Sequence, residues 1–240
     1  MRLFVTRFVR RVGAALIVVG VLVSVLAVAH AESQARNRPR LAARARAETQ
    51  VAFIGDSITN LSGPTFRRVL VAQGYPEPFV SGINGIRADQ RVTEAPALLA
   101  PVHPDVLVIE LGTNDVGQFA QDHPGADAAT RDAHARTVAA NVAALAGSTP
   151  CVVIVNVSAN TMSPVANDIA RAENRALADW VIHEPRAHLA DWDHVVADEF
   201  ARGEPDGSMT SDTVHPTAHG ADRLADLVAH TIDTGCQVHA

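Results

Sequence analysis

Three short polar blocks carry side chains that could together transfer an acyl group. Ser57 follows an apolar run within a Gly-Asp-Ser sequence, where its hydroxyl could attack a carbonyl carbon. Asp212 lies three residues before His215, so its carboxylate can accept from one ring nitrogen and leave the other as a general base. Asn114, in a Gly-Thr-Asn-Asp sequence, can donate through its amide to a developing oxyanion. This is the chemistry of a serine nucleophile acting on an ester.

Each block also has a purely structural interpretation. Asp and Ser are favoured helix caps, so Ser57 on its own is more typical of a cap than of a nucleophile. Asn114 would equally suit a turn that closes a loop. A fourth block, residues 84–89 with the sequence NGIRAD, could direct a backbone N–H toward the site or form an ordinary glycine turn. Only the combination of blocks indicates catalysis.

Alternating strand and helix patterns would bring these blocks to one edge of a sheet. Apolar runs predict strands at 50–54, 78–83, 105–111, 151–157 and 188–190. The runs at 105–111 and 151–157 are nearly continuous, which suits strands that are covered on both faces. Helical periodicity is found near 64–74, 91–99, 129–147, 164–183 and 217–232. This alternation predicts a three-layer α/β/α sandwich around a five-stranded parallel sheet. Ligands of such sheets bind at the carboxyl ends of the strands, which all four blocks follow or approach.

In their order and spacing over residues 50–232, the four blocks resemble the SGNH hydrolases, the GDSL-type esterase and lipase family. The resemblance implies a flavodoxin-like fold in which Ser57 is the nucleophile and Asp212 and His215 complete the triad. It implies an oxyanion hole formed by Ser57, Asn114 and a glycine of the family. That glycine aligns with Ala88, which still has a backbone N–H, or with Gly85 if the alignment shifts.

The resemblance implies a serine esterase that cleaves carboxylic esters through an acyl-enzyme on Ser57, with no cofactor or metal. We expect a small acyl ester, such as an acetylated glycan, or a lysolipid. Phe119 and His219 are candidates for the mouth of the site, together with loops 116–128, 158–163 and 203–211. Two alternatives stay open, namely an acyltransferase that uses the same acyl-enzyme and a catalytically silent binding module, which the alanine at position 88 suggests.

Charge is distributed unevenly along the 240 residues, whose net charge is −6. Residues 1–49 hold nine of the 20 basic residues, and residues 50–240 carry 11 Arg against 24 acids. A domain with a net charge of −13 repels phosphate backbones, so we expect no nucleic-acid partner. The expected oligomeric state is a monomer.

The first 31 residues predict an export signal or a membrane anchor. A basic start is followed by 18 uncharged residues, 12–29, and by the small-x-small sequence Ala29-His30-Ala31. Such a run suits a cleaved signal peptide and is just long enough to span a bilayer, so both interpretations stay open, with cleavage favoured. Residues 32–49 predict an Arg-rich linker that could associate with a membrane or the cell envelope, and residues 50–240 form the hydrolase domain. The expected location is secreted or in the cell envelope.

The chain has two cysteines, Cys151 and Cys236, and an even number in an exported protein favours a disulfide. Cys151 opens a predicted strand, and Cys236 follows a helix that runs back antiparallel to the strands. We expect both thiols at the edge of the sheet opposite the chemistry.

Overall fold

A computed structural model describes residues 39–202 and 208–236. The predicted signal or anchor segment lies outside the described residues. Within the predicted linker, residues 39–48 form a helix. The chain divides into two compact units with a boundary after Ala45, and the second unit holds every element described below. No helix in the described part of the chain has both the length and the apolar character that crossing a membrane requires.

The second unit is built on a five-stranded sheet in which every pairing is parallel. The strand order is β2-β1-β3-β4-β5. The strands are β1 (Val51–Gly55), β2 (Phe79–Gly82), β3 (Val106–Glu110), β4 (Cys151–Val155) and β5 (Ala187–Ala190). All residues of β1, β3 and β4 are buried, as expected for strands covered on both faces. The predicted fold class is confirmed.

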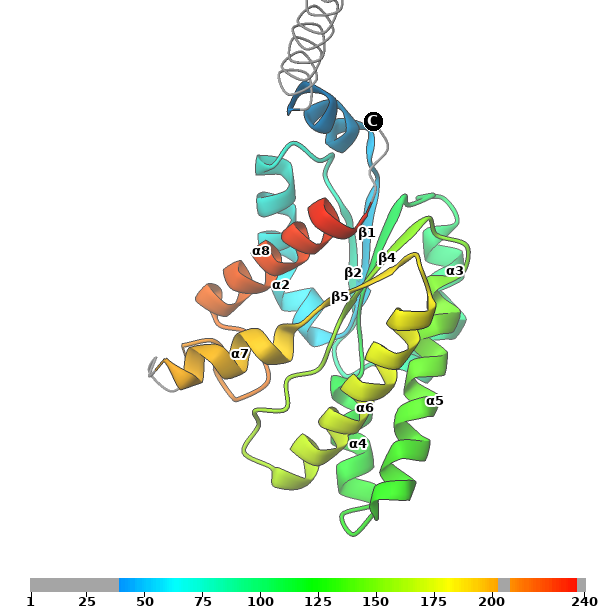
Figure 1. Ribbon diagram of the computed structural model, residues 1–240, viewed down its shortest axis with the longest axis vertical. Coiled ribbons are helices and arrows are strands. Elements are labelled where there is room, and N and C mark those ends of the chain that lie inside the picture. The colour runs from blue at the N-terminus through cyan, green and yellow to red at the C-terminus, as the bar shows by residue number, and fades with distance from the viewer. Residues whose placement is uncertain (1–38, 203–207, 237–240) are drawn as a thin grey trace, which may run out of the picture. The chain divides into compact units, whose positions relative to one another are not determined.

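Helices cover both faces of the sheet, with α2 and α8 on one side and α3, α5 and α6 on the other (Figure 1). The helices are α2 (Ser57–Ala72), α3 (Ala88–Leu99), α4 (Thr113–Asp122), α5 (Ala128–Ala146), α6 (Pro164–His183), α7 (Trp192–Ala201) and α8 (Ala218–Gly235). Helical periodicity in the sequence predicted that α2 begins near residue 64, and it did not predict α4 or α7. All three segments follow strands closely, and two of them, the start of α2 and α4, contain Ser57 and Asn114 of the candidate site.

Alternate residues of each strand divide the core into two layers. Phe53 and Val108 pack with Phe66 of α2 and Val228 of α8 on one face. Ile54 and its neighbours in β3 and β4 pack with α5 and α6 on the other. Because apolar side chains are buried on both faces, the strands are fixed in register and their carboxyl ends meet at one edge.

Cys151 and Cys236 form a disulfide with a Cα–Cα separation of 5.6 Å, as predicted. Cys151 is the first residue of β4, and Cys236 follows the last turn of α8. The bridge therefore ties α8 to the amino end of the sheet, away from the carboxyl ends of the strands.

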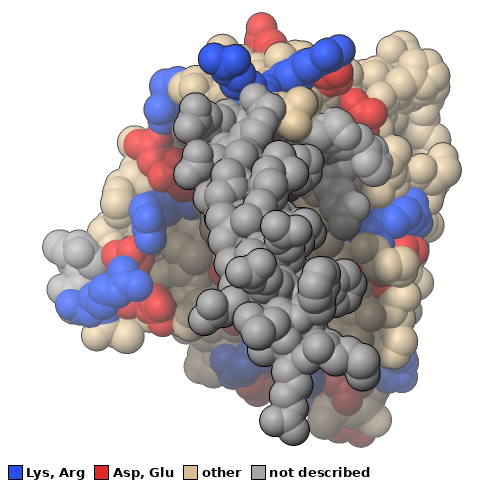
Figure 2. All heavy atoms as spheres, turned by 45° about the horizontal axis from the view of Figure 1, so that its top comes forward, with Lys and Arg blue, Asp and Glu red and all other residues tan. Residues whose placement is uncertain are grey.

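The surface carries charges of both signs. On the face shown in Figure 2, arginine side chains are interspersed with aspartate and glutamate. Some of these charges form pairs, such as Arg46 with Asp233 at 2.6 Å.

Candidate active site

Ser57 and His215 meet at the carboxyl edge of the sheet, although 158 residues separate them in the chain. Ser57 Oγ lies 2.9 Å from His215 Nε2, and His215 Nδ1 lies 2.7 Å from Asp212 Oδ2. If the Nδ1–H of His215 donates a hydrogen bond to Asp212, Nε2 is left as the acceptor for the serine hydroxyl. The structure thus brings the three predicted triad residues together in the relay that activates a serine.

The helix cap next to Ser57 is supplied by Asp56. Asp56 Oδ1 accepts from the backbone N–H of Ile58, and Ser57 is the first residue of α2. The Ser57 hydroxyl is thereby free to pair with His215 rather than with the helix backbone. The cap and the candidate nucleophile are therefore two adjacent residues, and the nucleophilic role of Ser57 stays a prediction.

The first turn of α2 leaves one backbone N–H unused, and it belongs to Ser57. The N–H of Ile58 donates to Asp56, that of Thr59 to Glu110 Oε2, and that of Asn60 to the Asp56 carbonyl. Among the described residues, no acceptor pairs with the Ser57 N–H. A helix N-terminus also favours negative charge, so this N–H can stabilise an oxyanion at the carbon that Ser57 attacks.

The loop that carries Asp212 and His215 is tightly folded. Thr213 has a φ of 68°, a left-handed conformation that is rare for a β-branched residue. This conformation curls the chain so that Asp212 Oδ1 accepts from the backbone N–H groups of Val214 and His215. Partial burial disfavours the ionised carboxyl, but these bonds and the His215 ring outweigh it and lower the pKa of Asp212 to about 2. Asp212 is therefore an ionised, oriented partner for the imidazole.

Asn114 follows β3 through Gly112, whose φ of 121° suits glycine. The Nδ2 of Asn114 donates to Asp56 Oδ2 at 2.9 Å and to the Ile86 carbonyl at 3.1 Å. Both amide hydrogens thus have protein acceptors, and donation to an oxyanion requires that one of these bonds be shared or exchanged. The role of Asn114 as an oxyanion donor stays a prediction.

Ala88 is unsuited to the oxyanion role assigned to it. It is fully buried, and its N–H donates to Asp115 Oδ2 at 3.1 Å. The alternative, Gly85, is exposed, and its N–H has no acceptor among the described residues. The turn around Gly85 lies beside the site, because Ile83 N–H bonds to the Gly55 carbonyl and the Ile86 carbonyl accepts from Asn114. Of the two candidates, Gly85 has the available donor.

Two buried carboxyl groups lie beneath the candidate nucleophile, and this pair was not predicted from the sequence. Asp56 is fully buried, and Glu110, the last residue of β3, is 4% exposed. Burial, followed by the charge of Asp56, raises the pKa of Glu110 well above its ordinary value. Burial also raises the pKa of Asp56, and the hydrogen bond from the Ile58 N–H lowers it by a smaller amount. A lone glutamate at the end of an otherwise apolar strand was the signal that could have found this pair.

Glu110 holds the nucleophile turn through Thr59. Glu110 Oε2 accepts from the Thr59 hydroxyl at 2.9 Å and from its N–H at 3.1 Å. Gly55 makes room for this contact, because a Cβ there would lie 1.9 Å from Thr59 Oγ1. The glycine before the Asp-Ser pair is therefore required by close packing.

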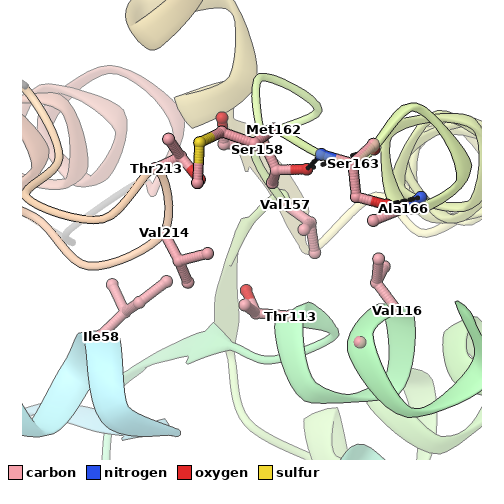
Figure 3. Close-up of a pocket in the computed structure, with 12 residues that line it drawn as sticks. Ile58, Thr113, Val116, Val157, Ser158, Met162, Ser163, Ala166, Thr213 and Val214 are labelled. Atoms are coloured by element: carbon pink, nitrogen blue, oxygen red, sulfur yellow. Dashed lines mark hydrogen bonds between the residues drawn. The ribbon is translucent and has the colours of Figure 1, made fainter. Parts of the chain in front are cut away.

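A cavity of about 290 Å³ opens beside the triad (Figure 3). Ile58 and Val214 lie on one side of it, and Val116, Val157 and Ala166 lie on the other. The 158–163 loop contributes to the lining, as expected. Val116 and Gly117 of the predicted 116–128 loop also line the cavity, and residues 203–207 of the third loop lie outside the described residues. The two single-residue candidates do not line it: Phe119 stacks on His134 with ring centroids 4.1 Å apart, and His219 is exposed on α8.

Among the described residues, the only group of three side chains placed to bind a metal is Cys151, His188 and Cys236. Both sulfurs of that group are joined in the disulfide. The relay at Ser57 is formed by side chains alone.

Three solved structures, those of an esterase, a lipase and a transferase, share this fold. An acetyl xylan esterase matches with a TM-score of 0.62 and 23% identity over 76% of this chain and 99% of its own. A lipase from a goat rumen metagenome matches with a TM-score of 0.63 and 16% identity over 80% and 100% of the two chains. The catalytic domain of peptidoglycan O-acetyltransferase A from Streptococcus pneumoniae matches at 0.57 and 15%, over 78% and 94%.

No curated protein matches the chain. Residues 53–223 match the GDSL-like Lipase/Acylhydrolase family, a segment that contains Ser57, Asn114, Asp212 and His215. With these residues at one edge of a five-stranded parallel sheet, the chain belongs to the GDSL-like lipase/acylhydrolase family and is a carboxylic ester hydrolase.

Proposed function

We propose that the protein hydrolyses carboxylic esters through an acyl-enzyme on Ser57. The observation that carries this proposal is the continuous relay from Ser57 Oγ through His215 to Asp212, with contacts of 2.9 and 2.7 Å. His215 Nε2 takes the hydroxyl proton as Ser57 Oγ bonds to the carbonyl carbon. The carbonyl oxygen becomes an oxyanion, and the backbone N–H groups of Ser57 and Gly85 are the donors available to it.

Collapse of the tetrahedral intermediate breaks the ester bond, and His215 returns its proton to the departing alcohol. Water then attacks the acyl-enzyme while His215 accepts one of its protons, and a second collapse releases the carboxylic acid and the free Ser57 hydroxyl. Throughout the cycle, the ionised Asp212 stabilises the imidazolium that forms at each proton transfer.

The test is to label the protein with a fluorophosphonate and to measure hydrolysis of p-nitrophenyl esters. Wild type should label at Ser57 and turn over, and Ser57→Ala should lose both while keeping its thermal unfolding midpoint. Ser62→Ala, on the same helix, is the matched control and should retain labelling. Full hydrolysis by Ser57→Ala would overturn the assignment, and a wild type that neither labels nor turns over would favour a silent binding module.

An acyltransferase is the second candidate. The triad is accessible, because the side chains of His215 and Asp212 are 33% and 54% exposed, so an alcohol bulkier than water can approach the acyl-enzyme. One structural neighbour, the peptidoglycan O-acetyltransferase, acts on such an acceptor. Product analysis with and without a glycan acceptor distinguishes the two activities: transfer predicts an acylated glycan, and hydrolysis predicts only the free acid.

We also propose that the protein is exported through residues 1–31. The basic start and the apolar run support this proposal, as does the disulfide between Cys151 and Cys236, which persists in oxidising compartments. Mass spectrometry of the mature N-terminus tests it. A terminus near residue 32 indicates cleavage, an intact terminus in the membrane fraction indicates an anchor, and an intact terminus in the cytosol would contradict export.

A further inference from the structure

Three residues that line the cavity are the sequence neighbours of candidate site residues. Ile58 follows Ser57, Thr113 precedes Asn114, and Val214 precedes His215, and all three neighbours line the cavity. The wall of the cavity therefore continues directly from the reacting groups, and the space is adjacent to the carbon that Ser57 attacks. We propose that this cavity is the acyl site and that it selects acyl chains of medium length, roughly six to ten carbons, over acetyl. This inference rests on the proposed esterase function.

The lining of the cavity suits an apolar chain. Five aliphatic residues form its two sides, and the described residues that line it include no charged group. Two hydroxyls of the 158–163 loop already bond to residues of α6. Thr161 Oγ1 donates to Asn167 Oδ1 at 2.7 Å, and Ser163 Oγ accepts from the Ala166 N–H. A charged acyl group would lose water here without gaining a charged partner, whereas an alkyl chain loses nothing.

The volume of the cavity sets the chain length. About 290 Å³ equals roughly ten water molecules at the volume that each occupies in the liquid. The single methyl group of an acetyl ester would leave most of this space unfilled. Each additional methylene buried in the cavity should raise kcat/KM by about fourfold until the cavity is full. This inference departs from the small acyl group that the sequence alone suggested.

Two residues of the cavity are placed to control its length. Gly117 of α4 lines the cavity, and a Cβ at that position would meet no atom within 4 Å. A side chain added there enters open space without displacing a neighbour. Met162 lies on the side of Thr213 and Ser158 (Figure 3), and it is 85% exposed. A flexible thioether side chain at this rim can cover a bound alkyl chain.

The experiment compares two ester series on the purified wild-type enzyme. In p-nitrophenyl esters from acetate to palmitate, kcat/KM should rise to a maximum between hexanoate and decanoate and fall beyond it. In n-alkyl acetates, lengthening the alcohol should have little effect. A maximum at acetate, or a chain-length preference on the alcohol side only, would overturn the assignment of the cavity to the acyl group.

A graded filling of the cavity tests the location of the site. Gly117→Ala, Gly117→Val and Gly117→Leu should move the optimum progressively toward acetate, with at least a tenfold loss on octanoate for the leucine variant and little change on acetate. Gln118→Leu, on the exposed side of the same helix, is the matched control and should keep the wild-type optimum. An unchanged optimum in Gly117→Leu would contradict the assignment of the cavity to the acyl group. If Ser57 is still labelled by the fluorophosphonate in that case, the proposed esterase function stands. Loss of labelling in wild type would instead reject the function on which the inference rests.

Discussion

Asp56 Oδ2 accepts a hydrogen bond from Asn114 Nδ2 at 2.9 Å, while Asp56 Oδ1 caps the helix that begins with Ser57. One carboxylate therefore fixes both the nucleophile turn and the candidate oxyanion amide. These two functional residues come from different strand ends and are 57 positions apart in the chain. Their relative placement depends on this one side chain.

Asp56→Ala should reduce kcat more than it reduces stability. Loss of a helix cap typically costs about 1 kcal/mol, which a folded domain tolerates. The variant also loses the hydrogen bonds that position Asn114 and the Ser57 turn. Because small displacements of catalytic groups slow the reaction strongly, kcat should fall by about 10- to 100-fold. Steady-state kinetics and thermal unfolding of Asp56→Ala check this, with Asp89→Ala as an exposed control. Wild-type kcat in Asp56→Ala would show that Asp56 acts only as a cap.

Glu110→Gln should behave almost like wild type, whereas Glu110→Ala should not. Burial raises the pKa of Glu110 well above its ordinary value, which favours the protonated form beside Asp56. A glutamine keeps an oxygen for Thr59 and an N–H for Asp56. Alanine leaves the Thr59 N–H and hydroxyl without their acceptor and opens a cavity, which should cost about 2–4 kcal/mol. Urea denaturation with ester hydrolysis measures both effects. Equal damage from the two substitutions would mean that Glu110 is ionised.

Much of this arrangement could be predicted from the residues, and the part that failed has a physical explanation. Apolar runs predicted the sheet, and Ser57, Asp212 and His215 were predicted because nucleophile, base and orienting acid have distinct side chains. Backbone donors have no such signature. Whether Ala88 or Gly85 offers an N–H depends on which one Asp115 engages, and a tertiary contact decides this. The extent of the cavity beside Ser57 likewise depends on how α4 and the 158–163 loop pack.

Asp115→Asn should stabilise the protein increasingly as the pH rises from about 4 to about 6. Burial raises the pKa of Asp115 from 3.8 to about 6, so the folded state retains a proton that the unfolded state has lost. Folded Asp115 therefore binds more protons in this window, and its contribution to stability falls as pH rises, by about 3 kcal/mol in total. Asparagine removes the charge and keeps an oxygen for the Ala88 N–H.

The measurement is the free energy of unfolding of wild type and Asp115→Asn from pH 4 to pH 8. The difference between them should grow up to about pH 6 and then level off. Asp122→Asn, an exposed residue of the same helix, removes the same charge and serves as the control. A difference that is constant with pH, or that shrinks as pH rises, would contradict a raised pKa at Asp115.

Removing the disulfide should weaken the fold and leave the chemistry unchanged. Cys151 and Cys236 are 85 positions apart. Closing a loop of that length lowers the entropy of the unfolded chain and so stabilises the folded state by about 4 kcal/mol. The bridge lies at the amino end of β4, whereas Ser57 and His215 lie at the carboxyl end of the sheet. The double variant Cys151→Ala with Cys236→Ala should therefore unfold at lower urea concentration, with a kcat within about twofold of wild type at 20 °C. Treating wild type with dithiothreitol should lower its stability similarly, and treating the double variant should have no effect. A large loss of kcat in the folded double variant would show that the two ends of the sheet are coupled.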